Sequence, residues 1–300
     1  MTLRDAVPRW VKARIKRALE KMGYRLVSVR AVVALPGADS PAVQPAQCSS
    51  IMDEYLALKT MSRIRARDAV EIEELYREFV FPDLPKRAGR QQMLTGLLGT
   101  TVSEAIYIIS CLHRALKVSG DICEFGVAQG ATSRLLGYEI LTGDRTLWLF
   151  DSFEGLPAPS EKDDLIDDIF SLGSMDRYKG TMRCSETEVL HKLAEIGFPP
   201  ARLKLKKGWI EDVLRQPDLP TAVAFAYVDF DFFEPIKAAL EFLDRCMTVG
   251  ATIVVDDYGY FSSGVQLAVD EFREKTTGRY RFDLPLACAG RFCILTKLER

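Results

Sequence analysis

From Asp121 onward, short apolar runs alternate with amphipathic stretches. The apolar runs are rich in β-branched or aromatic residues: Ile122–Val127, Leu147–Phe150, Ala222–Val228, Thr252–Val255 and, more weakly, Leu203–Lys207. Such runs are typical of strands that are buried on both faces of a parallel sheet. Apolar residues at helical spacing lie between them, over Ser133–Leu141, Thr187–Ile196 and Glu234–Arg245. The alternation predicts an α/β fold built on a mostly parallel sheet.

The chain ends in two further strand patterns, Tyr280–Leu284 and Phe292–Lys297, which are joined through Gly290. Strands joined by a short connection pair antiparallel, because a parallel pair needs a long crossover. The sequence therefore predicts an antiparallel pair at the edge of the sheet.

The first part of the chain is basic and has a different pattern. Residues 1–30 hold nine Lys and Arg against two acidic residues, and Pro8–Leu26 has apolar residues at roughly helical spacing. We therefore predict a basic amphipathic helix over residues 1–34. Such a helix could lie on an anionic membrane, but a surface helix with a solvated basic face is more common and is the interpretation we favour.

The next segments predict a linker and a helical extension. Residues 35–50 contain three prolines and few apolar residues, which is typical of a linker. Helical spacing returns over residues 51–80, is interrupted by the two prolines of Phe81–Arg90, and resumes from Ser103 to Leu116. We therefore predict a helical extension over residues 51–118 and an α/β domain over residues 119–300.

Composition disfavours several functional classes. A formal net charge of −2 argues against a nucleic-acid-binding protein. The seven cysteines form no CxxC pair, so we expect reduced thiols and a cytoplasmic protein. Two histidines make a His-rich zinc site improbable. The N-terminus lacks the apolar core of a signal peptide, and no apolar run is long enough to span a bilayer.

The segment Glu124–Gly130 (EFGVAQG) follows the first predicted strand and precedes a helix. Gly126 and Gly130 allow a tight turn and a close approach of the backbone to a ligand. The segment matches neither the dinucleotide-binding fingerprint nor a P-loop, and it fits an amino-acid or sulfonium group better than a phosphate. A purely structural turn is the alternative.

Asp151 ends the next predicted strand, LWLFD. In open α/β sheets, ligands bind at the carboxyl ends of the strands, and an acidic residue there can accept hydrogen bonds from ribose hydroxyls. The alternative is that Asp151 caps a helix or a loop.

Two acidic pairs end two other strands. Asp229 and Asp231 lie in YVDFD, and Asp256 and Asp257 lie in IVVDDY. Carboxylate oxygens are hard ligands that suit Mg²⁺ or Ca²⁺, and four carboxylates at one edge of the sheet would repel one another without a cation. Asp231 could instead face the substrate and act as a general base. Separate capping of two helices is the alternative.

A long segment, Ser152–Glu186, separates the second strand from the next helix. Long loops beside a binding site are usually lids. The segment carries four aspartates, Asp163, Asp164, Asp167 and Asp168, and for these we favour a solvated face over a metal site.

The chain from Phe81 to its C-terminus resembles the macrocin O-methyltransferase (TylF-type) family, which belongs to the class I S-adenosylmethionine-dependent methyltransferases. Six motifs carry the resemblance: CEFGVAQGATS, LWLFDSFEGLP, GSM…YKGTM, KGWIED, FAYVDFDFFEPIKAALEFL and IVVDDYG…AVDEF. The family methylates sugar hydroxyls of macrolides and related natural products.

The resemblance implies a Rossmann-like class I methyltransferase fold with a seven-stranded, mostly parallel sheet and an antiparallel final strand. It implies S-adenosylmethionine and Mg²⁺ as cofactors, a sugar-bearing small-molecule acceptor, and a homo-oligomer. The implied cofactor-binding residues are Glu124, Gly126, Gly130, Thr132, Asp151, Ser152, Gly208 and Trp209. The implied metal ligands are Asp229, Asp256 and Asp257, and the implied catalytic base is Asp231.

The chain departs from the family pattern at two positions. Familiar members carry Asp-Gly-Asp where this chain has Phe230 between Asp229 and Asp231, and the common class I pattern has glycine at the position of Ala128. The carboxylates survive both changes, so the expected reaction is unaffected. Phe230 would reshape the wall of the acceptor pocket.

Three other functions compete with this one. Asp229-Phe230-Asp231 is also a DxD motif, which in a glycosyltransferase binds a metal and a nucleotide sugar, but Asp256 and Asp257 would then have no role. A non-catalytic partner protein with the same fold is a second alternative, which the intact carboxylates disfavour. An NAD dehydrogenase lacks its glycine fingerprint.

Overall fold

The structure is a computed structural model that describes residues 24–28, 31–34, 66–97 and 99–299. The chain divides into two units, Met1–Thr60 and Met61–Arg300. In the first unit, β1 (Tyr24–Ser28) pairs antiparallel with β2 (Ala31–Ala34). The helix predicted over residues 1–34 is therefore wrong for this stretch, where β-branched and aromatic residues favour strands. The remaining residues of that prediction and the linker at 35–50 lie outside the described residues.

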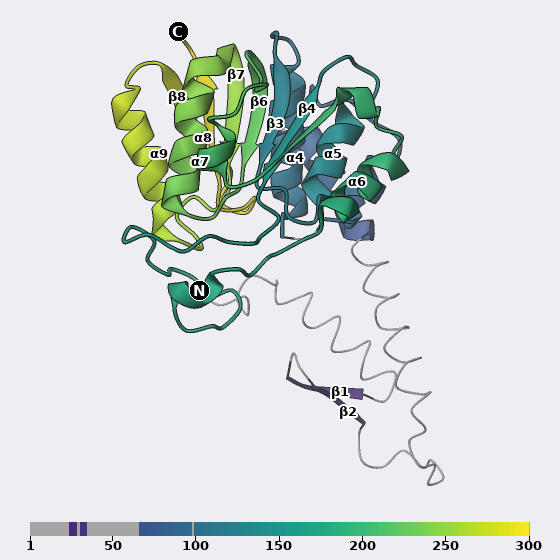
Figure 1. The fold of residues 1–300 in the computed structure, drawn as a ribbon. Coiled ribbons are helices and arrows are strands. Elements are labelled where there is room, and N and C mark those ends of the chain that lie inside the picture. The colour runs from purple at the N-terminus through teal and green to yellow at the C-terminus, as the bar shows by residue number, and fades with distance from the viewer. Residues whose placement is uncertain (1–23, 29–30, 35–65, 98, 300) are drawn as a thin grey trace. The chain divides into compact units, whose positions relative to one another are not determined.

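The second unit is built on a seven-stranded sheet in the order β5-β4-β3-β6-β7-β9-β8 (Figure 1). The strands are β3 (Asp121–Phe125), β4 (Leu147–Asp151), β5 (Leu203–Lys207), β6 (Val223–Val228), β7 (Met247–Val255), β8 (Tyr280–Asp283) and β9 (Cys293–Lys297). The pairs from β5 to β7 are parallel, and β9 runs antiparallel to both of its neighbours, β7 and β8. This confirms the predicted mostly parallel sheet with an antiparallel final strand.

Helices cover both faces of the sheet, and each face has its own apolar core (Figure 1). The first core includes residues of the helix at 66–79 and of α3 (Arg90–Thr95), α4 (Val102–Ala115), α5 (Ala131–Glu139) and α6 (Glu186–Glu195). The second includes residues of α7 (Ile210–Val213), α8 (Phe233–Cys246) and α9 (Ser263–Lys275). Along β4, Leu147 and Leu149 face the first core and Trp148 and Phe150 the second, as the two-residue period of a strand requires.

The sequence pattern predicted most of these elements but missed three α-helices. The helical spacing seen after residue 50 is confirmed over residues 66–79, and residues 51–65 lie outside the described residues. The short helices α3 and α7 and the longer helix α9 were not predicted. Among the described residues, no helix is both long and apolar enough to cross a bilayer.

A buried arginine joins the helix at 66–79 to α5 within the second unit. Arg90 is fully buried, and its guanidinium forms two bonds to Glu139 at the end of α5, Nε to Oε1 at 2.7 Å and Nη2 to Oε2 at 2.9 Å. Its Nη1 lies 3.0 Å from Oε1 of Glu73 in the helix at 66–79. Burial raises the pKa of Glu139, but hydrogen bonds from Arg90 and His113 outweigh it and hold that pKa below its usual value. The Glu139 carboxylate is therefore kept charged, and Arg90 is a shared partner of Glu139 and Glu73.

Replacing Arg90 by methionine keeps most of the side-chain volume but removes the cation. We expect Arg90→Met to lower the free energy of unfolding by about 3–5 kcal/mol, because two buried carboxylates lose their partner. Arg67→Met is the matched control, since Arg67 is exposed and pairs with Glu71 at 3.5 Å on the surface, and it should cost less than about 1 kcal/mol. Denaturant unfolding measures both values. Equal losses in the two variants would contradict this account.

Candidate active site

The candidate active site is an acidic edge at the carboxyl ends of neighbouring strands β6 and β7. Asp229 directly follows β6, and Asp256 directly follows β7. The hydroxyl of Tyr227 lies between them, 2.7 Å from Oδ2 of Asp256 and 3.4 Å from Oδ2 of Asp229. The structure thus brings together the two acidic strand ends that the sequence predicted to be neighbours.

A fifth carboxyl group, Glu104 of α4, joins this edge from the helical extension. Its Oε1 lies 3.3 Å from the Tyr227 hydroxyl, and the residue is only 4% exposed. Sequence reasoning missed it. Thr101 and Glu104 form the Thr-x-x-Glu pattern of a capping box, which predicts a local role at the start of a helix. Thr101 does cap α4, since its Oγ1 accepts from the Glu104 backbone N–H at 3.1 Å, but the Glu104 carboxyl points to the acidic edge.

Burial and mutual repulsion disfavour full ionisation of these carboxyl groups. Burial raises the pKa of Asp229 well above its usual range, and Asp256 and Asp257 raise it further. The pKa of Asp231 is raised by burial and then by Asp229, and that of Asp257 by burial and then by Asp256. Burial, followed by Asp256, also raises the pKa of Glu104. A nearby cation would allow them to carry negative charge together.

The arrangement does not form a closed metal site. Within the described ranges, no three His, Cys, Asp or Glu side chains converge closely enough to hold one ion. The donor chemistry of Asp229, Asp256 and Asp257 nevertheless suits a hard divalent cation, because carboxylate oxygens are its usual ligands.

Asp231 and Asp257 have strained backbones. Their φ angles are +64° and +55°, in the left-handed region that side chains other than glycine rarely adopt. Conformations of this kind persist only where the surrounding structure imposes them, and they cluster at functional sites. Asp231 lies two residues after Asp229, and Asp257 directly follows Asp256, so each strained residue is close to a strand end that carries another aspartate.

Glu124 lies on β3 beside this edge, and only one of its two carboxyl oxygens has a partner in the part of the chain that the structure describes. It is 1% exposed, and its Oε2 accepts a 2.5 Å hydrogen bond from the Ser133 hydroxyl. Among the described residues, Oε1 has no hydrogen-bond donor. Burial raises the pKa of Glu124 to about 8 despite the Ser133 hydrogen bond, and Asp151 contributes in the same direction. A buried acceptor of this kind suits a donor supplied by a ligand.

The glycine turn after β3 is required by the packing of the protein itself. At Gly126, with φ +86°, a Cβ would lie 1.9 Å from the carbonyl oxygen of Asp229. At Gly130, with φ +74°, a Cβ would contact Val189 at 3.0 Å. Ala128, where the family pattern has glycine, has φ +45° and is strained. The predicted turn is confirmed, and the structural interpretation alone accounts for both glycines.

Asp151 holds the glycine turn in place. Its Oδ2 accepts from the backbone N–H groups of Val127 at 2.7 Å and Ala128 at 3.0 Å, and its Oδ1 accepts from Phe153 at 2.6 Å. These bonds correspond to the capping alternative, but a carboxylate has about four acceptor positions and one remains for a ligand hydroxyl.

Four other residues were predicted to bind the cofactor: Gly208, Trp209, Ser152 and Thr132. The backbone N–H of Gly208 donates to the Asp151 carbonyl at 3.0 Å, so Gly208 and half-exposed Trp209 lie at the same edge of the sheet. The Ser152 hydroxyl accepts from the backbone N–H of Glu154 at 3.0 Å. The Thr132 hydroxyl lies 3.2 Å from the hydroxyl of Thr100. Ser152 and Thr132 are thus engaged within the protein.

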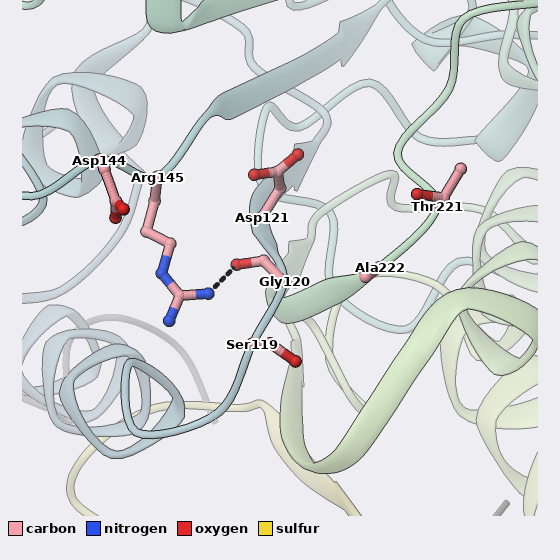
Figure 2. A pocket seen from close by; sticks show the side chains of 7 residues that line it. All are labelled: Ser119, Gly120, Asp121, Asp144, Arg145, Thr221 and Ala222. Carbon is pink, nitrogen blue, oxygen red and sulfur yellow. Dashed lines mark hydrogen bonds between the residues drawn. The ribbon is translucent and has the colours of Figure 1, made fainter.

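A hollow of about 420 Å³ lies at the opposite edge of the sheet (Figure 2). It is lined by Ser119, Gly120, Asp121, Asp144, Arg145, Thr221 and Ala222. Arg145 donates to the carbonyl oxygen of Gly120 (Figure 2). It also donates to the carbonyl oxygens of Val118 and Leu116, so its guanidinium is already used to hold the chain. The hollow is open and contains none of the predicted site residues.

Comparison with known proteins identifies the family of this chain. A sequence model of the macrocin O-methyltransferase (TylF) family matches residues 108–280, which is more than half of the chain. The demethyldecarbamoylnovobiocin O-methyltransferase of Streptomyces niveus is 30% identical over 162 residues, covering 53% of this chain and 60% of that protein. An O-methyltransferase of Streptomyces olivaceus, named for the 4′ position of a rhamnosyl-tetracenomycin C, is 28% identical over 183 residues, covering 59% and 66%. The matches therefore span somewhat less than two thirds of these two relatives.

The fold has solved counterparts. The structure of the O-methyltransferase NovP aligns with a TM-score of 0.57 at 21% identity, covering 78% of this chain and all of that one. At this identity the likeness establishes the shared fold.

The raised pKa of Glu124 predicts a pH dependence of stability. Between its ordinary pKa of 4.5 and about 8, the folded protein without ligands binds a proton that the unfolded chain has released, so stability falls as pH rises through this window. We expect Glu124→Gln to remove this loss, which is on the order of 4 kcal/mol. The measurement is the free energy of unfolding from pH 5 to pH 8. Glu154→Gln, an exposed control, should keep the wild-type slope, and the same slope in Glu124→Gln would refute the assignment.

Proposed function

The chain belongs to the macrocin O-methyltransferase family, and from this we propose that it transfers the methyl group of S-adenosylmethionine to a hydroxyl of a sugar-bearing small molecule. The observation that carries the proposal is the Glu124 oxygen beside the glycine turn that has no hydrogen-bond partner among the described residues. The ammonium group of an amino acid would supply both the missing donor and a positive charge, which would keep Glu124 ionised. The methionine part of S-adenosylmethionine carries such a group.

Asp151 is proposed to orient the ribose. Its carboxylate already fixes the turn through Val127 and Ala128, so the same side chain would hold both the turn and the ligand. Gly208 and Trp209 would border the adenine at the end of β5, and Thr132 and Ser152 would line the remainder of the cofactor site.

Asp229, Asp256 and Asp257 are proposed to hold Mg²⁺. Support comes from their carboxylate donors, their place at adjacent strand ends, and the burial and mutual repulsion that raise the pKa values of Asp229 and Asp257. When bound, Mg²⁺ supplies a charge that lowers the pKa of a nearby hydroxyl, and S-adenosylmethionine supplies an electrophilic methyl group.

Asp231 is proposed as the general base. It lies two residues beyond Asp229, and burial, followed by the charge of Asp229, raises its pKa, which makes it a stronger proton acceptor than an ordinary aspartate. It would accept the proton of the acceptor hydroxyl as the oxygen attacks. Its fixed, left-handed backbone would keep the carboxylate at one position relative to the cofactor site.

The acceptor is proposed to be a sugar-bearing natural product, because the Streptomyces olivaceus relative is named for a rhamnosyl group. Phe230 lies between Asp229 and Asp231 and packs edge-on against Phe125 at 6.1 Å between ring centroids, so it would form part of the acceptor wall. A homo-oligomer and a cytoplasmic location remain predictions.

The test of this function uses Asp231→Asn. Methyl transfer is followed with labelled S-adenosylmethionine against a panel of sugar-bearing acceptors, and binding of S-adenosylhomocysteine is followed by calorimetry. We expect wild-type protein to bind S-adenosylhomocysteine at micromolar concentration, and Asp231→Asn to bind it equally well. Turnover of the variant should fall by a factor of about 10²–10⁴, the usual contribution of a general base.

Each result bears on a different part of the proposal. Unchanged turnover in Asp231→Asn would remove Asp231 as the base. No binding of S-adenosylhomocysteine by wild-type protein, with Mg²⁺ or with EDTA, would overturn the cofactor assignment. Glu154→Gln is a surface control that should leave both measurements unchanged.

A further inference from the structure

The long segment between β4 and α6 is attached to the two turns that carry the acidic residues. Its Asp163 is 5% exposed, which differs from the solvated face that the sequence favoured. The Asp163 Oδ2 accepts from the backbone N–H and the hydroxyl of Ser160, at 2.8 and 2.6 Å. The Oδ1 accepts from the backbone N–H of Phe233 at 2.8 Å and from the Ser262 hydroxyl at 3.0 Å. One carboxylate therefore joins three segments of the chain.

The two partners outside the segment begin the helices that follow the acidic turns. Phe233 is the first residue of α8, whose own N-cap residue, Phe232, gives no side-chain hydrogen bond. Ser262 is the N-cap of α9. Asp163 thus satisfies an N–H of α8 that the helix leaves open and orients the residue that caps α9.

Gly264 in α9 leaves the space that the Asp163 carboxylate occupies. A Cβ at Gly264 would lie 1.9 Å from the Asp163 Oδ1 and 2.8 Å from the Phe233 nitrogen. Any larger residue at position 264 would therefore push Asp163 away from α8 and α9.

Further contacts fix the same segment to the turn after β7. The Ile166 N–H donates to the Phe261 carbonyl at 3.0 Å, and the Ser263 N–H donates to the Asp164 carbonyl at 3.0 Å. Phe232 and Phe261 share a small buried cluster with Leu156, Met175 and Tyr178 of the segment. Phe232 directly follows Asp231, and Phe261 lies four residues after Asp257.

We propose that Asp163 is a positioning residue that holds Asp231 and Asp257 in their strained conformations by bonding the segment to the starts of α8 and α9. Strained residues need surroundings that impose their conformation, and Asp163 supplies fixed bonds just downstream of both turns. Because the metal and base roles of these aspartates belong to the proposed function, this inference rests on it.

The test compares Asp163→Asn with Asp168→Asn. Asp168 accepts from Leu172, Gly173 and Tyr178, all within the segment, so it is the matched control. An asparagine at position 163 replaces one carboxylate oxygen with an NH₂ group. That group is a donor and cannot accept the hydrogen bonds that the replaced oxygen accepts. The readouts are hydrogen exchange by mass spectrometry, calorimetric binding of Mn²⁺, and binding of S-adenosylhomocysteine.

In Asp163→Asn we expect peptides covering residues 229–233 and 256–264 to exchange at least tenfold faster relative to peptides of β3 and β6. Mn²⁺ affinity should fall at least tenfold, while S-adenosylhomocysteine affinity stays within threefold. In Asp168→Asn, faster exchange should be confined to residues 168–180. If Asp163→Asn fails to fold, Ser160→Ala, which removes one bond to Asp163, should show a smaller change in the same two turns.

Faster exchange confined to residues 152–185 in Asp163→Asn would overturn the proposal, as would wild-type Mn²⁺ affinity in that variant. A wild-type protein that binds no Mn²⁺ would instead overturn the metal part of the proposed function. The exchange data would then still decide whether Asp163 holds the two turns.

Discussion

Repulsion among carboxyl groups at one edge of the sheet is the constraint on which the candidate site depends. Asp229 and Asp256 end adjacent parallel strands, so the fold itself places them together. Glu104 adds a further carboxyl group from another helix, and Tyr227 provides a hydroxyl within reach of all three. Burial makes this arrangement costly for a protein without ligands. A bound cation would offset this cost, so the site is suited to bind positive charge.

The rest of the site reinforces this arrangement. Glu124 on β3 is another buried carboxyl group, and one of its oxygens lacks a partner among the described residues. Asp163 and the small buried cluster around Phe232 and Phe261 hold the segment between β4 and α6 against the turns after β6 and β7. Arg90 fixes the helices at 66–79 and α5, the same layer to which α4 and Glu104 belong. A cationic cofactor beside Glu124 and a metal ion at the acidic edge would each supply the positive charge that lets these buried carboxyl groups ionise.

Periodicity predicted the strands of the sheet because they are buried on both faces, and the acidic strand ends followed from parallel topology. The motifs around Glu124, Asp151 and Asp229 also predicted the family. Glu104 escaped prediction because its Thr-x-x-Glu context indicates a helix cap, and only packing turns its carboxyl toward Tyr227. Asp163 escaped because its partners lie 70 and 99 residues away, and no local pattern encodes such contacts. Helix α9 was missed in the pattern analysis.

The most direct test of the central claim is the free energy of unfolding of the wild-type protein as a function of Mg²⁺ concentration, at neutral pH and constant ionic strength. If the acidic edge binds the ion, stability should rise with Mg²⁺, by about 2.7 kcal/mol at a concentration one hundred times the Kd. The rise should disappear in Asp256→Asn. A free energy of unfolding that does not change with Mg²⁺ would contradict the claim that the clustered carboxylates form a cation site.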